Sequence, residues 1–296
     1  MTLERLGRVG VWSGRLQRHP TPEAIAAALE YEEMGLRCLW IPESPGAKDV
    51  LTFAAVLLGA SDDLIVATGI AIIWARDPVA MMNASRTLAD AFPGRFVLGL
   101  GVSHRSTAEL RGHEYDRPMA TMRTYLGAMD AAPFDGHPPD RPAPRVLAAL
   151  GPRMTALAAE MTDGVHPFLS TPTHVAGARA IVGTAKFIGV EQAIIWTSDP
   201  AIARETAREN LQRFLAWPNY QRHLLRSGFR EIDLANGGSD RLVDEIYAWG
   251  DDAAIRKRVQ AHLAAGADHV CLQVVPTADT EERSVWRALS PALRDI

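Results

Sequence analysis

The sequence predicts an α/β fold in which eight βα units close into a (β/α)8 TIM barrel. Short apolar runs, typical of parallel strands covered on both faces, alternate with longer segments of helical period along the 296 residues. Eight such cycles in a chain of this length match the barrel. An open doubly wound sheet also alternates strands and helices, but the fingerprint G-x-G-x-x-G is absent from the first strand-to-helix turn. We therefore expect a single barrel domain over residues 1–296.

Composition supports a large core and argues against several classes of partner. Apolar residues make up 47% of the chain and charged residues 22%, and the net charge of −4 is not concentrated in one half. No nucleic-acid-binding surface is implied. The first ten residues lack an apolar signal core and no run of about 18 apolar residues follows, so we expect a cytoplasmic protein without a membrane partner. Cys38 and Cys271 lie in apolar runs and are predicted to be buried.

The strands are expected where a short apolar run ends at a turn residue. Cys38-Leu39-Trp40-Ile41, closed by Pro42, is one clear example, and Leu64 to Thr68 is the strongest run in the sequence. The expected strands are 9–12, 38–41, 64–68, 96–100, 145–150, 165–169, 193–196 and 269–275.

The helices are expected between these runs, and four of them begin with a polar residue followed by proline. The polar side chain can cap free N–H groups, and proline fits the first turn. These starts are Thr21-Pro22, Asp77-Pro78, Thr171-Pro172 and Asp199-Pro200. Further helical stripes cover 51–60, 119–129, 154–161 and 255–263. Residues 200–250 exceed one crossover helix, so we predict a helix, a loop insertion and a second helix there.

In a parallel barrel, the residues that contact ligands lie just beyond the C-terminal ends of the strands, because the strand-to-helix loops open on that face. Few residues expected there are charged, and Glu43 is the one obvious carboxylate. Paired-carboxylate chemistry such as glycoside hydrolysis is therefore disfavoured. The positions expected at the mouth are Trp12-Ser13, Glu43-Ser44, Gly69-Ile70 with Trp74, Gly101 to His104, Leu150 to Pro152, His166 to Ser170, Trp196-Thr197 and Gln273.

The same positions disfavour metal and Schiff-base chemistry. The nine histidines include no H-x-H or H-E-x-x-H spacing, so no metal site is expected. A Schiff base needs a lysine in the mouth, and none of Lys48, Lys186 and Lys257 follows a strand. A mouth rich in tryptophan, glycine and isoleucine suits a flat apolar ring, for which a cofactor is the natural occupant.

Two glycine turns at the ends of neighbouring strands could hold the phosphate of such a cofactor. Residues 99–103 and 150–153 each precede or approach a helix whose free N–H groups could face an anion. Either turn could equally be a tight turn with no ligand. Barrel phosphate sites more often follow the seventh and eighth strands, where this chain has no glycine turn.

Several sequence blocks, taken together and in order, resemble the luciferase-like monooxygenase superfamily, specifically its actinobacterial branch of coenzyme F420 (deazaflavin) dependent oxidoreductases. The similarity spans nearly the entire chain. The blocks are Leu39-Trp40-Ile41-Pro42-Glu43, Ala67-Thr68-Gly69-Ile70, Arg95 to Val102, Tyr115 to Pro118, Met122 to Leu126, Ala149 to Met154, Asp163-Gly164 and Ala265 to Val270.

This resemblance implies a cofactor that lies across the barrel mouth, with its ring backed by a bulge in the third strand. In relatives the bulge contains a non-prolyl cis peptide bond, which here would be Gly69-Ile70, although an ordinary trans bulge is the alternative. The phosphate and side chain of the cofactor would be held by the two glycine turns. The cofactor-binding residues expected are Ser44, Gly69, Ile70, Gly101, Val102, Ser103, Leu150, Gly151, Pro152 and Met154. By position alone, Trp12, Trp74, His166, Phe168 and Trp196 would shape the substrate pocket.

The chain departs from the family at the end of the second strand. Several deazaflavin enzymes have an acidic residue followed by a histidine there, whereas this chain has Glu43 followed by Ser44. A proton must then come from Glu43, His104, His166 or solvent, and we take Glu43 and His104 as the catalytic candidates. His104 and His166 could equally be ordinary polar loop residues.

Three functions remain open from the sequence. The leading prediction is a coenzyme F420-dependent oxidoreductase that transfers a hydride between the deazaflavin C5 and a small organic substrate. The first alternative is an FMNH2-dependent luciferase-like monooxygenase that uses O2 and binds FMN, and the second is a non-catalytic barrel that sequesters a cofactor or ligand. Relatives usually pair through barrel helices, so a homodimer is expected.

Overall fold

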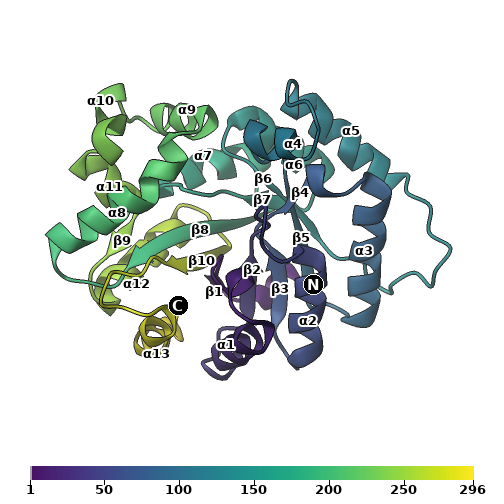
Figure 1. Cartoon of the computed structure of the whole chain (residues 1–296), viewed down its shortest axis with the longest axis horizontal. Helices are drawn as coiled ribbons and strands as arrows, with labels where there is room; N and C mark the ends of the chain where they lie inside the picture. The colour runs from purple at the N-terminus through teal and green to yellow at the C-terminus, as the bar shows by residue number, and fades with distance from the viewer. Residues whose placement is uncertain (1) are drawn as a thin grey trace.

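Eight parallel strands close into a barrel in the computed structural model, which describes residues 2–296 (Figure 1). The strand order is β10-β1-β2-β3-β5-β6-β7-β8, and the ring closes because β10 pairs in parallel with both β1 and β8. The predicted barrel is confirmed, and the open sheet is excluded. The barrel strands are β1 Val9–Trp12, β2 Cys38–Ile41, β3 Ile65–Thr68, β5 Phe96–Gly101, β6 Arg145–Ala148, β7 Gly164–His166, β8 Phe187–Ile195 and β10 His269–Val274.

Two further short strands lie at the edge of the ring. β4 (Ala71–Ile72) follows β3 after a two-residue interruption and pairs with β5. β9 (Ala248–Trp249) pairs with the end of β8. Both are too short to give a periodic signal in the sequence.

The largest error in the sequence prediction concerns the seventh barrel strand. We predicted 193–196, whereas β8 begins at Phe187 and all nine of its residues are buried. Glu191 and Gln192 lie inside this strand, and two consecutive polar residues hid its apolar character. β7 ends at His166 rather than at 169, because Pro167 follows directly and has no N–H to donate to the ladder. Leu169 also departs from strand geometry, with a φ of 54° in the left-handed region. β6 ends at Ala148 rather than at 150.

Helices surround the barrel, and most begin where the sequence predicted. The side chains of Asp77, Thr171 and Asp199 accept hydrogen bonds from backbone N–H groups of the first turn, each before a proline. Thr21 differs, because it is the first helical residue and Pro20 precedes the helix. The helices are α1 Thr21–Glu33, α2 Val50–Ala60, α3 Pro78–Ala91, α4 Arg105–Leu110, α5 Pro118–Asp130, α6 Pro152–Met161, α7 Pro172–Val182, α8 Pro200–Leu215, α9 Pro218–Arg226, α10 Glu231–Leu234, α11 Asp240–Ile246, α12 Asp252–Ala264 and α13 Glu282–Leu293.

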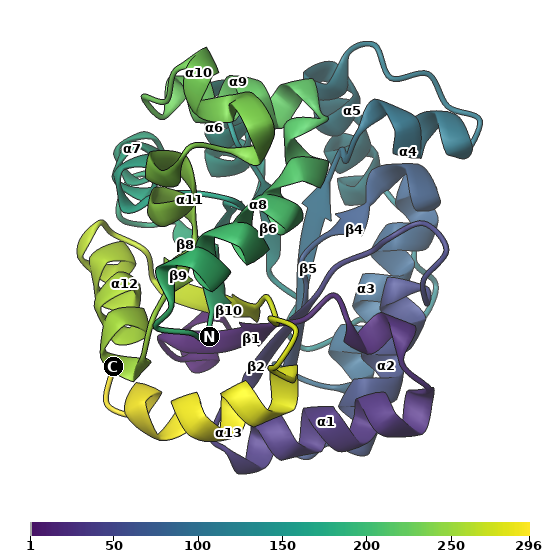
Figure 2. The same cartoon turned by 60° about the vertical axis from the view of Figure 1, so that its left-hand side comes forward.

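The insertion predicted between residues 200 and 250 is confirmed and is more structured than expected. It contains α8 to α11 and a 3-10 turn at Ala235–Gly237 before the chain returns through β9. Figure 2 shows α8 running across the front of the barrel toward α9, which lies near α6 and α7. The insertion therefore supplies side chains to the same end of the barrel as the glycine turn before α6.

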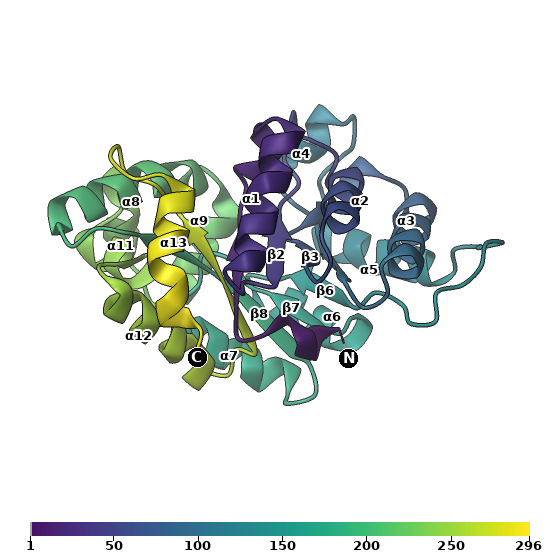
Figure 3. The same ribbon diagram turned by 90° about the horizontal axis from the view of Figure 1, so that it is seen from below.

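The C-terminal helix α13 was not predicted, and it packs against α1 (Figure 3). The rings of Tyr31 and Trp286 meet edge to face at 5.9 Å between centroids, and Arg283 and Arg287 both pair with Glu30. Within residues 2–296, no helix combines the length and hydrophobicity needed to cross a bilayer.

A stack of aromatic and imidazole rings fills the barrel interior, from His269 at the start of β10 to His166 at the end of β7. The rings of Trp40 and His166 stack at 4.3 Å between centroids, and Trp40 Nε1 donates to Nε2 of His269 at 3.1 Å. His269 Nδ1 in turn donates to the carbonyl oxygen of Gly7 at 2.8 Å. Cys38 and Cys271 are buried in this interior, as predicted. Any ligand must therefore approach from the C-terminal end of the strands.

Candidate functional site

The third strand is interrupted at the mouth by a cis peptide bond between Gly69 and Ile70. This confirms the bond that the family resemblance implied. Glu43, which follows β2, hydrogen-bonds to the backbone just after the cis bond. Its backbone N–H donates to the Ile70 carbonyl at 3.0 Å, and its Oε2 accepts from the Ile72 N–H at 2.7 Å. The bulge between Thr68 and Ala71 is therefore fixed from the end of the neighbouring strand.

The glycines of β5 provide space for this bulge. A Cβ on Gly99 would lie 1.9 Å from the carbonyl oxygen of Thr68, and a Cβ on Gly101 would lie 2.7 Å from Cδ1 of Ile70. Thr68 Oγ1 also accepts from the Gly99 N–H at 2.8 Å. Gly99 and Gly101 thus have a packing role that the sequence reasoning, which assigned Gly101 to the phosphate, did not foresee.

Glu43 is held as an ion pair in the wall of the site. Arg76 donates from Nη2 to Oε1 at 2.7 Å and from Nη1 to Oε2 at 3.1 Å, and the Glu43 side chain is 4% exposed. Both carboxylate oxygens are therefore occupied by donors. This geometry suits positioning of the bulge better than proton transfer to a ligand.

Two buried nitrogens without partners among the described residues face the bulge. Trp12 Nε1 and His166 Nε2 lie 2.7 Å and 3.3 Å from the position that a Cβ on Gly69 would take. His166 Nδ1 lies 2.7 Å from the Gly189 carbonyl oxygen, so it donates there and Nε2 carries the lone pair. Burial lowers the pKa of His166 to about 4, which keeps the ring neutral. A donor and an acceptor thus lie side by side over the cis bond.

Aromatic rings from the insertion cover the mouth above this pair. Phe168 lies 5.5 Å from Trp12, 5.4 Å from Phe214 and 6.3 Å from Tyr220, measured between ring centroids. His104 stacks on Trp217 at 3.9 Å, and burial lowers the pKa of its imidazole. The predicted pocket residues Trp12, His166 and Phe168 are therefore brought together.

The remaining predicted pocket residues lie elsewhere. Trp74 donates from Nε1 to the Val102 carbonyl at 2.7 Å and so flanks the first glycine turn. Trp196 packs against the cluster between the barrel wall and the helices, apart from Trp12 and Phe168. Ser44 is half-buried next to Glu43, and its carbonyl closes a turn with the Ala47 N–H.

The first glycine turn leads into a short helix. Ser103 has a φ of 51°, and its carbonyl oxygen accepts from the hydroxyl of Tyr115 at 3.1 Å. His104 precedes α4 without a side-chain cap, but α4 has only six residues. The turn is thus fixed by neighbouring aromatic side chains.

The second glycine turn has the features of an anion site. Gly151 precedes α6 with no side-chain cap and Pro152 is its first residue, so the N–H groups of Arg153 and Met154 have no intrahelical partner. Arg226 of α9 donates to the Leu150 carbonyl at 3.3 Å, and its Nη2 lies 3.2 Å from where a Cβ on Gly151 would be. Helix N–H groups and a guanidinium thus lie close together.

The sequence reasoning missed two ionisable residues at this end of the barrel. Arg226 belongs to the insertion, 76 residues from its partner Leu150, and nothing local in the sequence marks it. Glu191 lies in β8, where it is 1% exposed, and burial raises the pKa of its carboxyl to about 8. Because Gln192 follows Glu191, nothing local in the sequence marks Glu191 as a buried residue of a strand.

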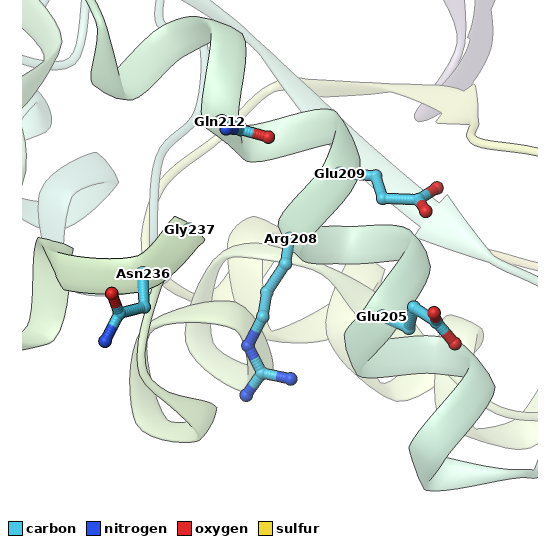
Figure 4. Close-up of a pocket in the computed structure, with 6 residues that line it drawn as sticks. All are labelled: Glu205, Arg208, Glu209, Gln212, Asn236 and Gly237. Atoms are coloured by element: carbon cyan, nitrogen blue, oxygen red, sulfur yellow. The ribbon is translucent and has the colours of Figure 1, made fainter.

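A groove of about 630 Å³ lies on the outer side of α8 (Figure 4). Its lining combines Glu205, Arg208 and Glu209 of α8 with the turn at Asn236 and Gly237. Arg208 already donates to the Gly238 carbonyl at 2.9 Å and pairs with Asp240, so its charge is satisfied. We therefore do not place the functional site there.

Comparison with known proteins identifies relatives of this chain. A protein of Mycobacterium tuberculosis that is provisionally named as a coenzyme F420-dependent oxidoreductase is 26% identical, over 93% of this chain and 95% of its own.

Two solved structures show the same fold at low identity. An F420-dependent secondary alcohol dehydrogenase in complex with an F420-acetone adduct superposes with a TM-score of 0.76 and 15% identity, covering 98% of this chain and 99% of that one. The EDTA monooxygenase of Chelativorans sp. BNC1 gives a TM-score of 0.74 and 14% identity, covering 98% and 93%. Residues 6–269, which include the bulge and both glycine turns, match the luciferase-like monooxygenase family. The chain therefore belongs to the luciferase-like monooxygenase family of oxidoreductases.

Proposed function

We propose that this protein is a coenzyme F420-dependent oxidoreductase that transfers a hydride between the deazaflavin C5 and a small organic substrate. The observation that carries the proposal is the pairing of two features at one end of the barrel. These are the cis bulge faced by the unpartnered nitrogens of Trp12 and His166, and the α6 N-terminus beside Arg226. The Mycobacterium tuberculosis relative named for coenzyme F420 supports the choice of cofactor.

The residues present fit a flat ring with an anionic side chain. The ring would lie over Gly69 and Ile70, where Trp12 Nε1 can donate to it and His166 Nε2 can accept from it. The phosphate would meet the N–H groups of Arg153 and Met154 and the guanidinium of Arg226. When bound, the deazaflavin supplies or accepts the hydride, and the protein supplies binding and orientation.

The chain's own residues prepare the site for this chemistry. Glu43, held by Arg76, keeps the bulge in place. The rings of Phe168, Trp217 and Tyr220 cover the mouth and limit the access of water, which would favour transfer between the two bound partners. Val102 and Ser103 would line the cofactor on the side of the first glycine turn.

Parallel titrations with coenzyme F420 and FMN test the proposal, with quenching of the seven tryptophans as the readout. We expect saturable quenching by F420 at micromolar concentration and much weaker binding of FMN. Tight FMN binding without a response to F420 would contradict the proposal and favour the FMNH2-dependent monooxygenase. Absence of binding by both would favour a different occupant of the mouth.

A further inference from the structure

Glu191 is a buried carboxyl group in the inner wall of the barrel to which the site described above gives no role. We propose that Glu191 is the proton donor and acceptor that accompanies hydride transfer, an inference that rests on the proposed function.

Its position is fixed by the alternation of side chains along β8. A Cβ on Gly189 would lie 3.3 Å from Trp40, so residue 189 faces the interior, and its carbonyl oxygen accepts from His166. Glu191 follows two residues later on the same face, one step closer to the C-terminal end of the strand. The carboxyl therefore lies between the His166 layer and the mouth.

The two oxygens of Glu191 have different surroundings. Oε2 accepts from the Leu169 N–H at 3.2 Å, whereas Oε1 is buried without a hydrogen-bond partner among residues 2–296. The charged and titratable groups close enough to interact electrostatically with the carboxyl are Arg213 of α8, Tyr220 of α9, Tyr247 after α11 and Cys271 of β10. No ion pair between Arg213 and Glu191 forms in the described part of the chain, so an ionised carboxylate would lack a close counter-ion.

The contrast with Glu43 assigns the two carboxyl groups different tasks. Glu43 has donors on both oxygens and a guanidinium partner, so neither oxygen is free to exchange a proton with a ligand. Glu191 has one weak donor and a dry environment, which favours the neutral acid. A neutral acid with its free oxygen inside the barrel can release a proton to a ligand bound at the mouth.

A purely structural role for Glu191 would explain the hydrogen bond accepted by Oε2 but not the buried Oε1 without a partner. The Leu169 N–H is held by Oε2 and its carbonyl oxygen by His223 Nε2 at 3.0 Å, which together fix a residue with a φ of 54°. Glutamine would perform that task equally well, because its amide oxygen can accept from the same N–H. Structural support does not require the proton that Glu191 carries.

In reduction, a hydride from the reduced deazaflavin adds to one atom of a substrate double bond, and the proton on Oε1 of Glu191 adds to the other. The double bond becomes single, the deazaflavin is oxidised, and Glu191 is left as a carboxylate that regains a proton from solvent. Oxidation runs in the opposite direction, with the carboxylate as base.

The test compares the wild type with Glu191→Gln, Glu191→Asp and the control Glu209→Gln, whose carboxylate is exposed on α8. F420 affinity is measured by tryptophan quenching. Oxidation of bound reduced F420 by cyclohexenone or acetone is followed in single turnovers from about pH 6 to about pH 9. We expect Glu191→Gln to bind F420 within about twofold of the wild type but to turn over about 100-fold more slowly. The wild-type rate should fall above about pH 8, and this fall should be lost in Glu191→Gln and kept at a lower rate in Glu191→Asp.

Equal rates and pH profiles for the wild type and Glu191→Gln would overturn the proposal. A wild type that does not bind F420 would instead contradict the proposed function. The protonation state of Glu191 can also be tested without cofactor, from the free energy of unfolding in urea. Because the folded-state pKa is raised, the stability advantage of Glu191→Gln over the wild type should grow as the pH rises from 4.5 to about 8. A constant difference across this range would show an ionised carboxylate and overturn the inference.

Discussion

Glu43 and Glu191, two glutamates of the barrel, differ in their hydrogen-bond and ion-pair partners. Glu43 is paired with Arg76, and Glu191 has no ion pair in the described part of the chain. A carboxyl group held in an ion pair can serve as a fixed structural partner, whereas one buried without a counter-ion can serve as an acid. The sequence identified Glu43 from its place after a strand, but the partner that fixes its role lies 33 residues away.

Removing Arg76, the partner of Glu43, should lower the free energy of unfolding. Arg76→Met leaves a buried carboxylate with one remaining N–H donor, so we expect a loss of about 3–5 kcal/mol in the free energy of unfolding. Arg123→Met breaks an exposed pair with Glu160, which solvent screens, so it should cost far less stability than Arg76→Met. Urea unfolding of both variants provides the comparison, and equal losses would show that the Glu43 pair is not buried as described.

The bulge after β3 and strand β5 form one packed unit, because β5 has glycines at the positions that contact the bulge. Gly99→Ala would place a Cβ against the carbonyl oxygen of Thr68, a backbone atom that cannot move aside. We expect unfolding or a loss above about 4 kcal/mol. Gly127→Ala in α5 meets nothing within 4 Å and should stabilise by about 0.5–1 kcal/mol. Thermal unfolding distinguishes the two, and a mild effect of Gly99→Ala would contradict the geometry of the bulge.

The N-terminus of α6 and helix α9 form a second unit, of which the sequence predicted only the part at α6. The turn at Gly151 was recognised, whereas Arg226 comes from an insertion whose packing is set by tertiary contacts. Arg226→Gln should weaken F420 binding about tenfold, because a charge-assisted contact with the anion is worth about 1–2 kcal/mol. Arg141→Gln, on an exposed loop, should leave the affinity unchanged. Equal affinities of the wild type and Arg226→Gln would place the anionic group elsewhere.

For the whole molecule, the barrel was predictable because its strands are buried on both faces and its helices carry clear start signals. The prediction failed where burial includes polar side chains, as at Glu191 and Gln192, and where a helix such as α13 is stabilised by contacts with a distant segment. The cis bond and the F420 cofactor came from family resemblance, since no local pattern specifies them.

The buried histidines predict how the stability of the fold changes as the pH falls. Burial lowers the pKa of His166, His223 and His269 to about 4 and that of His174 and His262 to about 3, against an ordinary value of 6.5. The unfolded chain therefore binds protons that the native fold resists, so stability present above pH 6.5 is lost as the pH falls toward 4. Urea unfolding should show a steep decline over that window, larger than the opposite slope from Glu191. A flat profile would mean that these imidazoles are solvated.

The most direct test of the account is a crystal structure of the protein with bound coenzyme F420. We expect the deazaflavin ring to lie on the Gly69-Ile70 bulge and the phosphate to accept hydrogen bonds from the Met154 N–H and from Arg226. A ring bound outside the barrel mouth, or a phosphate held away from α6, would contradict it.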